Sequence, residues 1–118
     1  MMKEEIRNRI LDFGADVCGF SGIDRFNGAP EGFHPCDIFK DCKSVIAFGM
    51  AIPKGIFLSE PRLIYSYYNN FVCSQTDRIA FQTAAMLEKF YHGAAVPLPS
   101  DGPYEEFLNV DILTFIDI

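Results

Sequence analysis

The stretch Ser44-Val-Ile-Ala-Phe-Gly-Met-Ala-Ile52 is nearly continuous in apolar residues and decides the fold class. It contains Gly49 and has the length of a strand rather than of a membrane-spanning or long core helix. Pro53 and Gly55 follow it directly and end the segment. Apolar residues at consecutive positions, without alternation, are typical of a strand that is covered on both faces. We therefore expect residues 44–52 to form such a strand.

Helical and extended segments alternate on both sides of this strand. Apolar residues at helical spacing predict a helix over residues 3–14, and residues 17–23 form a short apolar and aromatic strand pattern. After the central strand, residues 60–92 keep a helical spacing. Ser74 and Asp77 resemble a capping box within that region. One long broken helix and two separate helices both fit this pattern.

Two further segments complete the order of elements. Residues 94–99 predict a third strand, which Pro97 and Pro99 restrict to an edge or a rim of the sheet. Residues 105–118 carry eight large apolar side chains, which predict a last strand or helix on the core, or an uncovered apolar surface. We expect residues 1–118 to be one α/β domain, with α+β as the alternative. It would hold three or four strands and three or four helices, in two or three layers.

Composition and charge exclude several classes of protein. Hydrophobic residues make up 49% of the 118 residues, which excludes a disordered chain. The net charge of −6 argues against a protein that binds nucleic acid, because such proteins cluster Lys and Arg. No apolar run reaches the roughly 18 residues of a membrane-spanning helix, and no apolar signal region opens the chain. We expect a cytoplasmic protein without direct membrane or nucleic-acid contacts.

The four cysteines are Cys18, Cys36, Cys42 and Cys73. In a cytoplasmic protein we expect reduced thiols rather than a disulfide framework. A four-iron cluster needs several closely grouped cysteines, and these are widely spaced. A zinc site from His34, Cys36 and Cys42 is conceivable, but no paired C-x2-C motif supports it. The sequence therefore predicts no metal site.

Several stretches match a known family when the chain is taken as a whole. The matching stretches are residues 14–23, 28–32, 35–49, 77–80 and 95–101. The most specific runs from Pro35-Cys-Asp-Ile-Phe-Lys-Asp-Cys through Lys43-Ser-Val-Ile46, a helical turn that leads into a buried strand. On these stretches the chain resembles the N-terminal part of the epoxyqueuosine reductase-like iron–sulfur proteins, which are relatives of the reductive dehalogenases.

The resemblance implies a redox ancestry. The longer relatives continue into a glycine-rich segment and a ferredoxin-like part with two four-iron clusters, and members of the epoxyqueuosine branch also hold cobalamin. This sequence carries none of those later motifs, so no cofactor is expected in this chain alone. The resemblance implies an N-terminal domain that contributes walls of a cofactor or substrate pocket, is inactive alone and lacks a C-terminal iron–sulfur domain. It names no catalytic residue.

Four residues are the candidates for such a pocket. Tyr68 and Asn69 lie where we expect a break in the helical region, and Ser100 and Asp101 follow the third strand. Ligand sites in open α/β sheets lie beyond the carboxyl ends of the strands, which favours a shared cleft. The alternative is that these side chains only cap a helix and a turn.

The apolar residues 105–118 also predict a partner. A contiguous apolar surface is rare on a monomer, and an exposed strand edge can pair with another copy. We therefore expect a homodimer that forms through this segment, unless the segment folds back onto its own sheet. These features leave a second hypothesis for the function, a non-enzymatic oligomerising interaction module.

Overall fold

A computed structural model describes residues 2–100 and 111–116 of the chain. These residues form four α-helices, one short 3-10 helix (η1) and four strands. The elements follow in the order α1 (Met2–Asp12), β1 (Val17–Gly22), η1 (Ile23–Phe26), α2 (Pro35–Ile38), β2 (Ser44–Gly49), α3 (Lys54–Leu58), α4 (Arg62–Tyr91), β3 (Ala94–Pro97) and β4 (Asp111–Ile116). The expectation of a mixed α and β domain of this size is confirmed.

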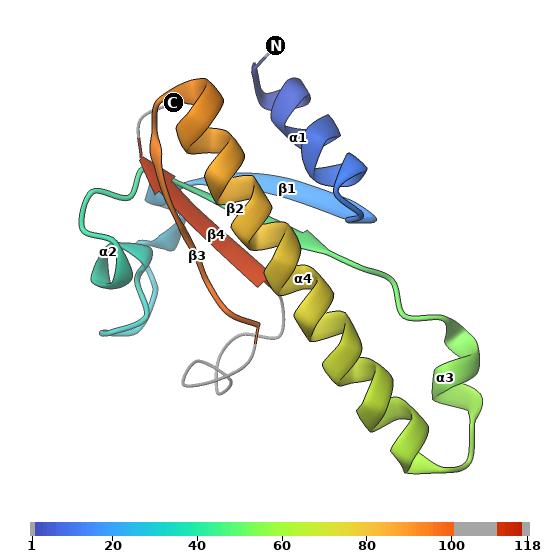
Figure 1. Ribbon diagram of the computed structural model, residues 1–118. Helices are drawn as coiled ribbons and strands as arrows, with labels where there is room; N and C mark the ends of the chain where they lie inside the picture. Colours follow the sequence, from blue (N-terminus) through green and yellow to red (C-terminus); the bar gives the residue numbers. More distant parts are fainter. Residues whose placement is uncertain (1, 101–110, 117–118) are drawn as a thin grey trace.

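The four strands form one sheet in the order β1-β2-β4-β3, and each neighbouring pair is antiparallel (Figure 1). In the register, Ile46 of β2 pairs with Phe20 of β1 on one side and with Leu113 of β4 on the other. β3 lies at an edge, as its prolines predicted. Because the sheet is antiparallel throughout, the rule that places ligands at the carboxyl ends of parallel strands does not apply to it.

The last segment contributes a central strand. β4 comes last in sequence but lies between β2 and β3, so both of its edges are paired. The expectation that residues 105–118 contain a strand that joins the sheet is therefore met by residues 111–116. Residues 101–110 and 117–118 lie outside the described part of the chain, and the prediction of a dimer through this segment stays untested.

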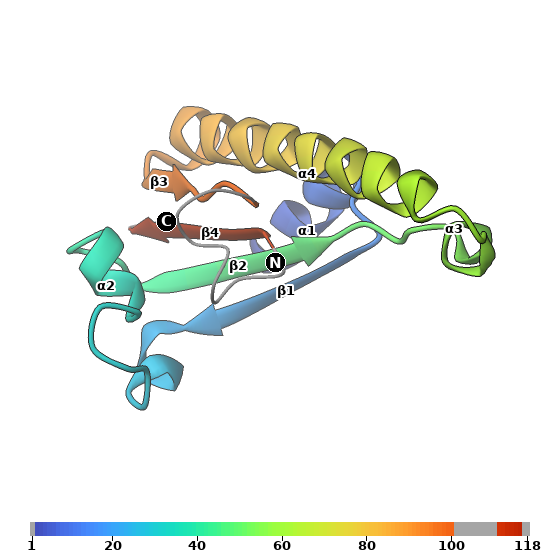
Figure 2. The same cartoon turned by 90° about the horizontal axis from the view of Figure 1, so that it is seen from below.

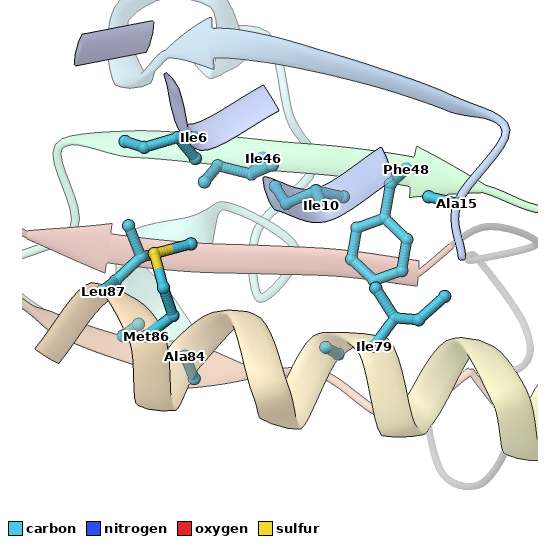
Figure 3. Packing of buried hydrophobic residues seen from close by; sticks show 11 residues of the cluster. Ile6, Ile10, Ala15, Ile46, Phe48, Ile79, Ala84, Met86 and Leu87 are labelled. Carbon is cyan, nitrogen blue, oxygen red and sulfur yellow. The ribbon is translucent and has the colours of Figure 1, made fainter. Parts of the chain in front are cut away.

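The core lies between the sheet and two helices. Figure 2 shows α1 and α4 on the same side of the sheet, which gives two layers. The buried cluster joins α1, the loop after it, β2, α4 and β3, and its members are Ile6, Ile10, Ala15, Ile46, Phe48, Ile79, Ala80, Ala84, Met86, Leu87 and Ala95 (Figure 3). Alternate residues of β2, Ile46 and Phe48, point into this cluster because side chains of a strand alternate between faces.

The opposite face of β2 is covered in part. Val45 points away from the helices and is nevertheless buried, whereas Ala47 and Gly49 on the same face are half-buried. The prediction of a strand with both faces covered thus holds at Val45. The strand ends at Gly49, earlier than the apolar run that continues to Ile52.

α4 is one unbroken helix of 30 residues. The expected capping box at Ser74 and Asp77 is wrong, because the Ser74 hydroxyl donates to the carbonyl oxygen of Phe71 within the same helix, at 2.8 Å. Asp77 instead accepts a hydrogen bond from outside the helix. The helix ends where His92 adopts the left-handed backbone conformation, with φ 57° and ψ 24°.

The amino-terminal third of α4 extends past the sheet, where α3 packs beside it (Figure 1). All residues from Arg62 to Tyr68 are exposed, and the buried positions of the helix begin at Thr76. The rings of Phe57 in α3 and Tyr65 in α4 lie 5.4 Å apart and join the two helices. α4 therefore has a projecting half, residues 62–75, which holds no buried position, and a core-facing half, residues 76–91. In the described residues, no helix is long and apolar enough to cross a membrane.

Candidate functional site

The predicted pocket residues lie on two neighbouring faces of α4. Asn69 is half-buried, and Cys73 and Asp77 follow it at spacings of four residues, which places all three on one side of the helix. Tyr68 lies on the adjacent side, where its ring makes edge contacts with Tyr67 at 5.0 Å and Phe71 at 6.3 Å between centroids. No helix break separates these residues, contrary to expectation.

Ser100 is bound directly to the side of α4 that carries Asn69. Its backbone N–H donates to Oδ1 of Asp77 at 2.8 Å, and its hydroxyl donates to the carbonyl oxygen of Cys73 at 3.1 Å. Cys73 lies one helical turn from Asn69, about 6 Å along the axis. The structure therefore ties Ser100 to the side of α4 that carries Asn69, at the level of Cys73 and Asp77, which lie one and two helical turns beyond Asn69. Asp101 lies outside the described residues.

A small cavity adjoins this junction. It has a volume of about 220 Å³ and is lined by Asp77, Ala80, Phe81, Pro97, Leu98 and Pro99. Most of its lining is apolar, and Asp77 is the charged group at its wall. Pockets for drug-sized ligands measure roughly 300–1,000 Å³. The cavity is thus too small to enclose a large cofactor, and the described residues supply at most one wall of a larger site.

A larger cleft lies between α1 and the end of β1, far from the predicted residues. Its volume is about 430 Å³, and it is lined by Met2, Lys3, Ile6, Phe20, Ser21, Gly22, Arg25 and Ser44. The ring of Phe20 lies beneath two cations, with Lys3 Nζ 5.6 Å and Arg7 Cζ 5.3 Å from its centroid. Arg7 also contacts the carboxylate of Glu4.

This cleft gathers positive charge in an acidic chain. Lys3 and Arg25 line it, while the net charge of the whole chain is −6. Sequence reasoning missed it because Lys3, Arg25 and Ser44 are far apart along the chain. The one local signal was the pair Lys3 and Arg7, which the four-residue spacing places on one side of α1.

Cys18 lies on β1 close to this cleft and packs against the core. Burial raises the pKa of its thiol, and the nearby Arg7 guanidinium lowers the pKa in part. A buried protonated thiol is a poor nucleophile and a poor metal ligand. This position therefore behaves as a small apolar residue of the core.

Cys36, Cys42 and His34 make local hydrogen bonds in and after α2. His34 caps this helix: its Nδ1 accepts from the backbone N–H of Cys36 at 3.0 Å, and its own N–H donates to Asp37. The thiols of Cys36 and Cys42 donate to the carbonyl oxygens of Cys42 and Ser44, at 3.7 and 3.4 Å. In the described part of the chain, no three His, Cys, Asp or Glu residues lie close enough to hold a metal ion.

A third cavity, of about 460 Å³, separates α3 from the start of α4. It is lined by Ile56, Phe57, Ser59, Glu60, Pro61, Arg62 and Tyr65. Its ionic groups are one carboxylate and one guanidinium, Glu60 and Arg62, and both residues are exposed. This arrangement is open to water and resembles the bend between two surface helices more than a ligand site.

Comparisons with known proteins give no match: no protein-family model, no curated protein and no solved structure is similar to this chain at a significant level. The arrangement of the described residues therefore carries the functional argument, together with the resemblance seen in the sequence. What the geometry defines is a small mixed α and β domain with one junction that links the end of β3 to the side of α4.

Proposed function

We propose that this chain is the N-terminal domain of an oxidoreductase that resembles the epoxyqueuosine reductase-like iron–sulfur proteins. In this proposal it forms one wall of a cofactor or substrate pocket in the cytoplasm and is inactive alone. The observation that carries the proposal is the junction of Ser100 with α4. Two hydrogen bonds hold this residue against Cys73 and Asp77, on the side of α4 that also carries Asn69, and this supports a shared surface for two of the four predicted residues.

The surroundings of the cysteine thiols support a separate region that holds the redox groups. In the described residues, the thiols of Cys36 and Cys42 donate to backbone carbonyls, and burial raises the pKa of the Cys18 thiol. These residues do not fit an iron–sulfur cluster, which needs four thiolates around one site. The cavity at the junction is likewise too small for a corrinoid. The redox groups of such an enzyme would be held by another region, which we propose as the partner.

The test combines the whole chain with a separately produced cluster-bearing region of an epoxyqueuosine reductase-like protein. Gel filtration in the presence of hydroxocobalamin, monitored in the visible range, would show whether the two elute together with bound corrinoid. We expect co-elution, and we expect Asn69→Ala and Ser100→Ala to weaken retention of the corrinoid. Ser74→Ala is the matched control, because the Ser74 hydroxyl is exposed and bonds only within its own helix turn.

The outcomes separate the proposal from its alternatives. Co-elution that Asn69→Ala and Ser100→Ala weaken, with Ser74→Ala unchanged, supports the pocket wall. Absence of a complex, or retention of the corrinoid that is equal in all three variants, overturns it. Thermal unfolding of each variant shows that a loss of binding does not come from a loss of fold.

A second candidate function rests on a different observation. The projecting half of α4 exposes several large aromatic and aliphatic side chains. Contiguous exposed apolar patches are typical of protein interaction sites. The chain could therefore serve as a non-enzymatic oligomerising module. A colourless protein that self-associates and binds no corrinoid favours this function over the first.

A further inference from the structure

We infer that the projecting half of α4 is the contact surface of a two-fold dimer of this chain, formed through five side chains that we name the aromatic stripe. The stripe consists of Leu63, Ile64, Tyr67, Tyr68 and Phe71. This inference goes beyond the proposed oxidoreductase role and does not depend on it, because Asn69 and the helix residues that bind Ser100 lie on another side of α4, and Tyr68 is the one pocket candidate that the stripe includes. It concerns a different surface from residues 105–118, through which the sequence predicts self-association.

The five residues share one side of the helix. Their spacings from Leu63 are one, four, five and eight residues, which span about 140° around a helix of 3.6 residues per turn. Their exposed fractions range from 37% to 77%. The core-facing positions Ile79, Thr83 and Leu87 are centred about 130° around the helix from the centre of the stripe. The two faces meet at Tyr68, which lies in line with the buried Met86. An apolar side of a helix that the described residues leave this exposed is unusual for a monomer.

The stripe also lacks charge. From Leu63 to Thr76 the sequence holds fourteen residues without a single Asp, Glu, Lys or Arg, counted from the printed sequence. Elsewhere the chain carries 26 charged residues and a net charge of −6, so two copies repel one another over most of their surface. The uncharged helix side is where two copies can approach closely. Interface cores are typically depleted of charge and enriched in Tyr and Phe.

The available area matches a dimer. From the exposed fractions, the five side chains offer on the order of 500 Å² of surface, taking about 200 Å² for a full aromatic side chain. A standard specific interface buries about 800 Å² on each partner. The polar residues that flank the stripe, such as Ser66 and Asn70, supply the remainder at the rim. A second copy of this chain is therefore an occupant of the right size and polarity.

The order of residues in the stripe is suited to two-fold symmetry. Leu63 and Phe71 lie four residues before and four residues after Tyr67. When two α4 helices pack antiparallel with the axis at Tyr67, Leu63 of one copy meets Phe71 of the other, and the two Tyr67 side chains meet at the axis. A two-fold contact of this kind is self-complementary and closes without leaving a free surface for further copies.

Charge substitutions at the axis test this geometry. Sedimentation equilibrium of the whole protein is expected to give twice the 13.3 kDa mass of one chain. Tyr67→Lys and Tyr67→Glu, each alone, place like charges opposite one another and should weaken dimerisation roughly 30-fold or more, as for a hot-spot residue. An equal mixture of the two variants pairs Lys with Glu and should restore the dimer. Phe81→Lys is the control, an exposed phenylalanine on the same helix outside the stripe.

Each result decides the inference. Monomeric wild-type protein overturns it, as does a dimer that Phe81→Lys weakens as much as Tyr67→Lys. Two monomeric variants that fail to pair when mixed overturn the antiparallel arrangement. Circular dichroism confirms that both variants keep their helix. If the chain is monomeric alone and Tyr67→Lys abolishes co-elution with the cluster-bearing region, the stripe belongs to that region, which overturns the dimer and leaves the proposed function standing.

Discussion

Leu87→Ala tests whether α4 holds the domain together through its core-facing half. Leu87 has no exposed surface and belongs to the cluster that joins α1, β2, β3 and α4 (Figure 3). Replacing a buried leucine by alanine costs about 2.7–5.0 kcal/mol, the higher values applying where neighbours cannot fill the cavity. Here a helix and a sheet bound the site, so little relaxation is possible. We expect the free energy of unfolding to fall by about 3–4 kcal/mol.

The assay is urea unfolding followed by circular dichroism, with thermal melting as a second measurement. At about 2.1 cal/mol/K of unfolding entropy per residue, the same loss lowers the melting temperature by about 12 °C or more. The matched control is Phe81→Ala, whose side chain on the same helix is 69% exposed, and its cost should stay below about 1 kcal/mol. Equal losses for the two variants would refute the assignment of the buried face.

Three further predictions concern backbone geometry and thiol chemistry. Gly14→Ala should lower the free energy of unfolding by about 2 kcal/mol in a denaturation experiment, because φ is +123° at this position. An added Cβ would meet only ordinary van der Waals contacts, so the backbone conformation is the expected cause. A loss no larger than that of Gly28→Ala would contradict this cause. His92→Gly should raise the free energy of unfolding by about 0.5–1 kcal/mol by relieving the left-handed conformation, and a lower melting temperature would count against it. Arg7→Gln should raise the pKa of Cys18 further, since Arg7 lowers it; alkylation of Cys18 followed by mass spectrometry should then require a higher pH, and an unchanged profile would refute the influence of Arg7.

Local sequence patterns were sufficient to predict most of the elements. The apolar run from Ser44 indicated β2, and helical spacing indicated α1 and the region of α4. The prolines at the end of β3 predicted its edge position, because Pro97 and Pro99 have no backbone N–H to donate to a further strand. These signals depend on neighbouring residues only, so they can be recognised without knowing the rest of the fold.

The continuity of α4 was not predictable from the same signals. Ser74 and Asp77 resembled a capping box, and with Asn69 they indicated a break. In the structure the hydroxyls of Ser74 and Thr76 donate to carbonyl oxygens three or four residues earlier, within the helix. Such bonds satisfy polar side chains without ending a helix. Tertiary packing from Ile79 onward stabilises the helix more than the local preferences weaken it.

The candidate site was predictable only in part. Ser100 does lie on the side of α4 that carries Asn69, but its hydrogen bonds are to Cys73 and Asp77, which are more than twenty positions away in the sequence. The cleft was expected at the carboxyl ends of parallel strands, and this rule does not apply to the antiparallel sheet of this domain. Tyr68 belongs to the aromatic stripe instead, because a step of one residue turns a helix by about 100°.

The order of the strands has a consequence for how the protein is made. The ribosome completes β3 before β4, yet β4 is the strand that connects β3 to the rest of the sheet. Ile116 lies nineteen positions after Pro97, so at roughly 5–20 residues per second β3 is synthesised about 1–4 s before β4 is complete. During this interval α4 is the available neighbour of β3. Slower translation of this stretch would lengthen the time in which the nascent strand can pair with another chain.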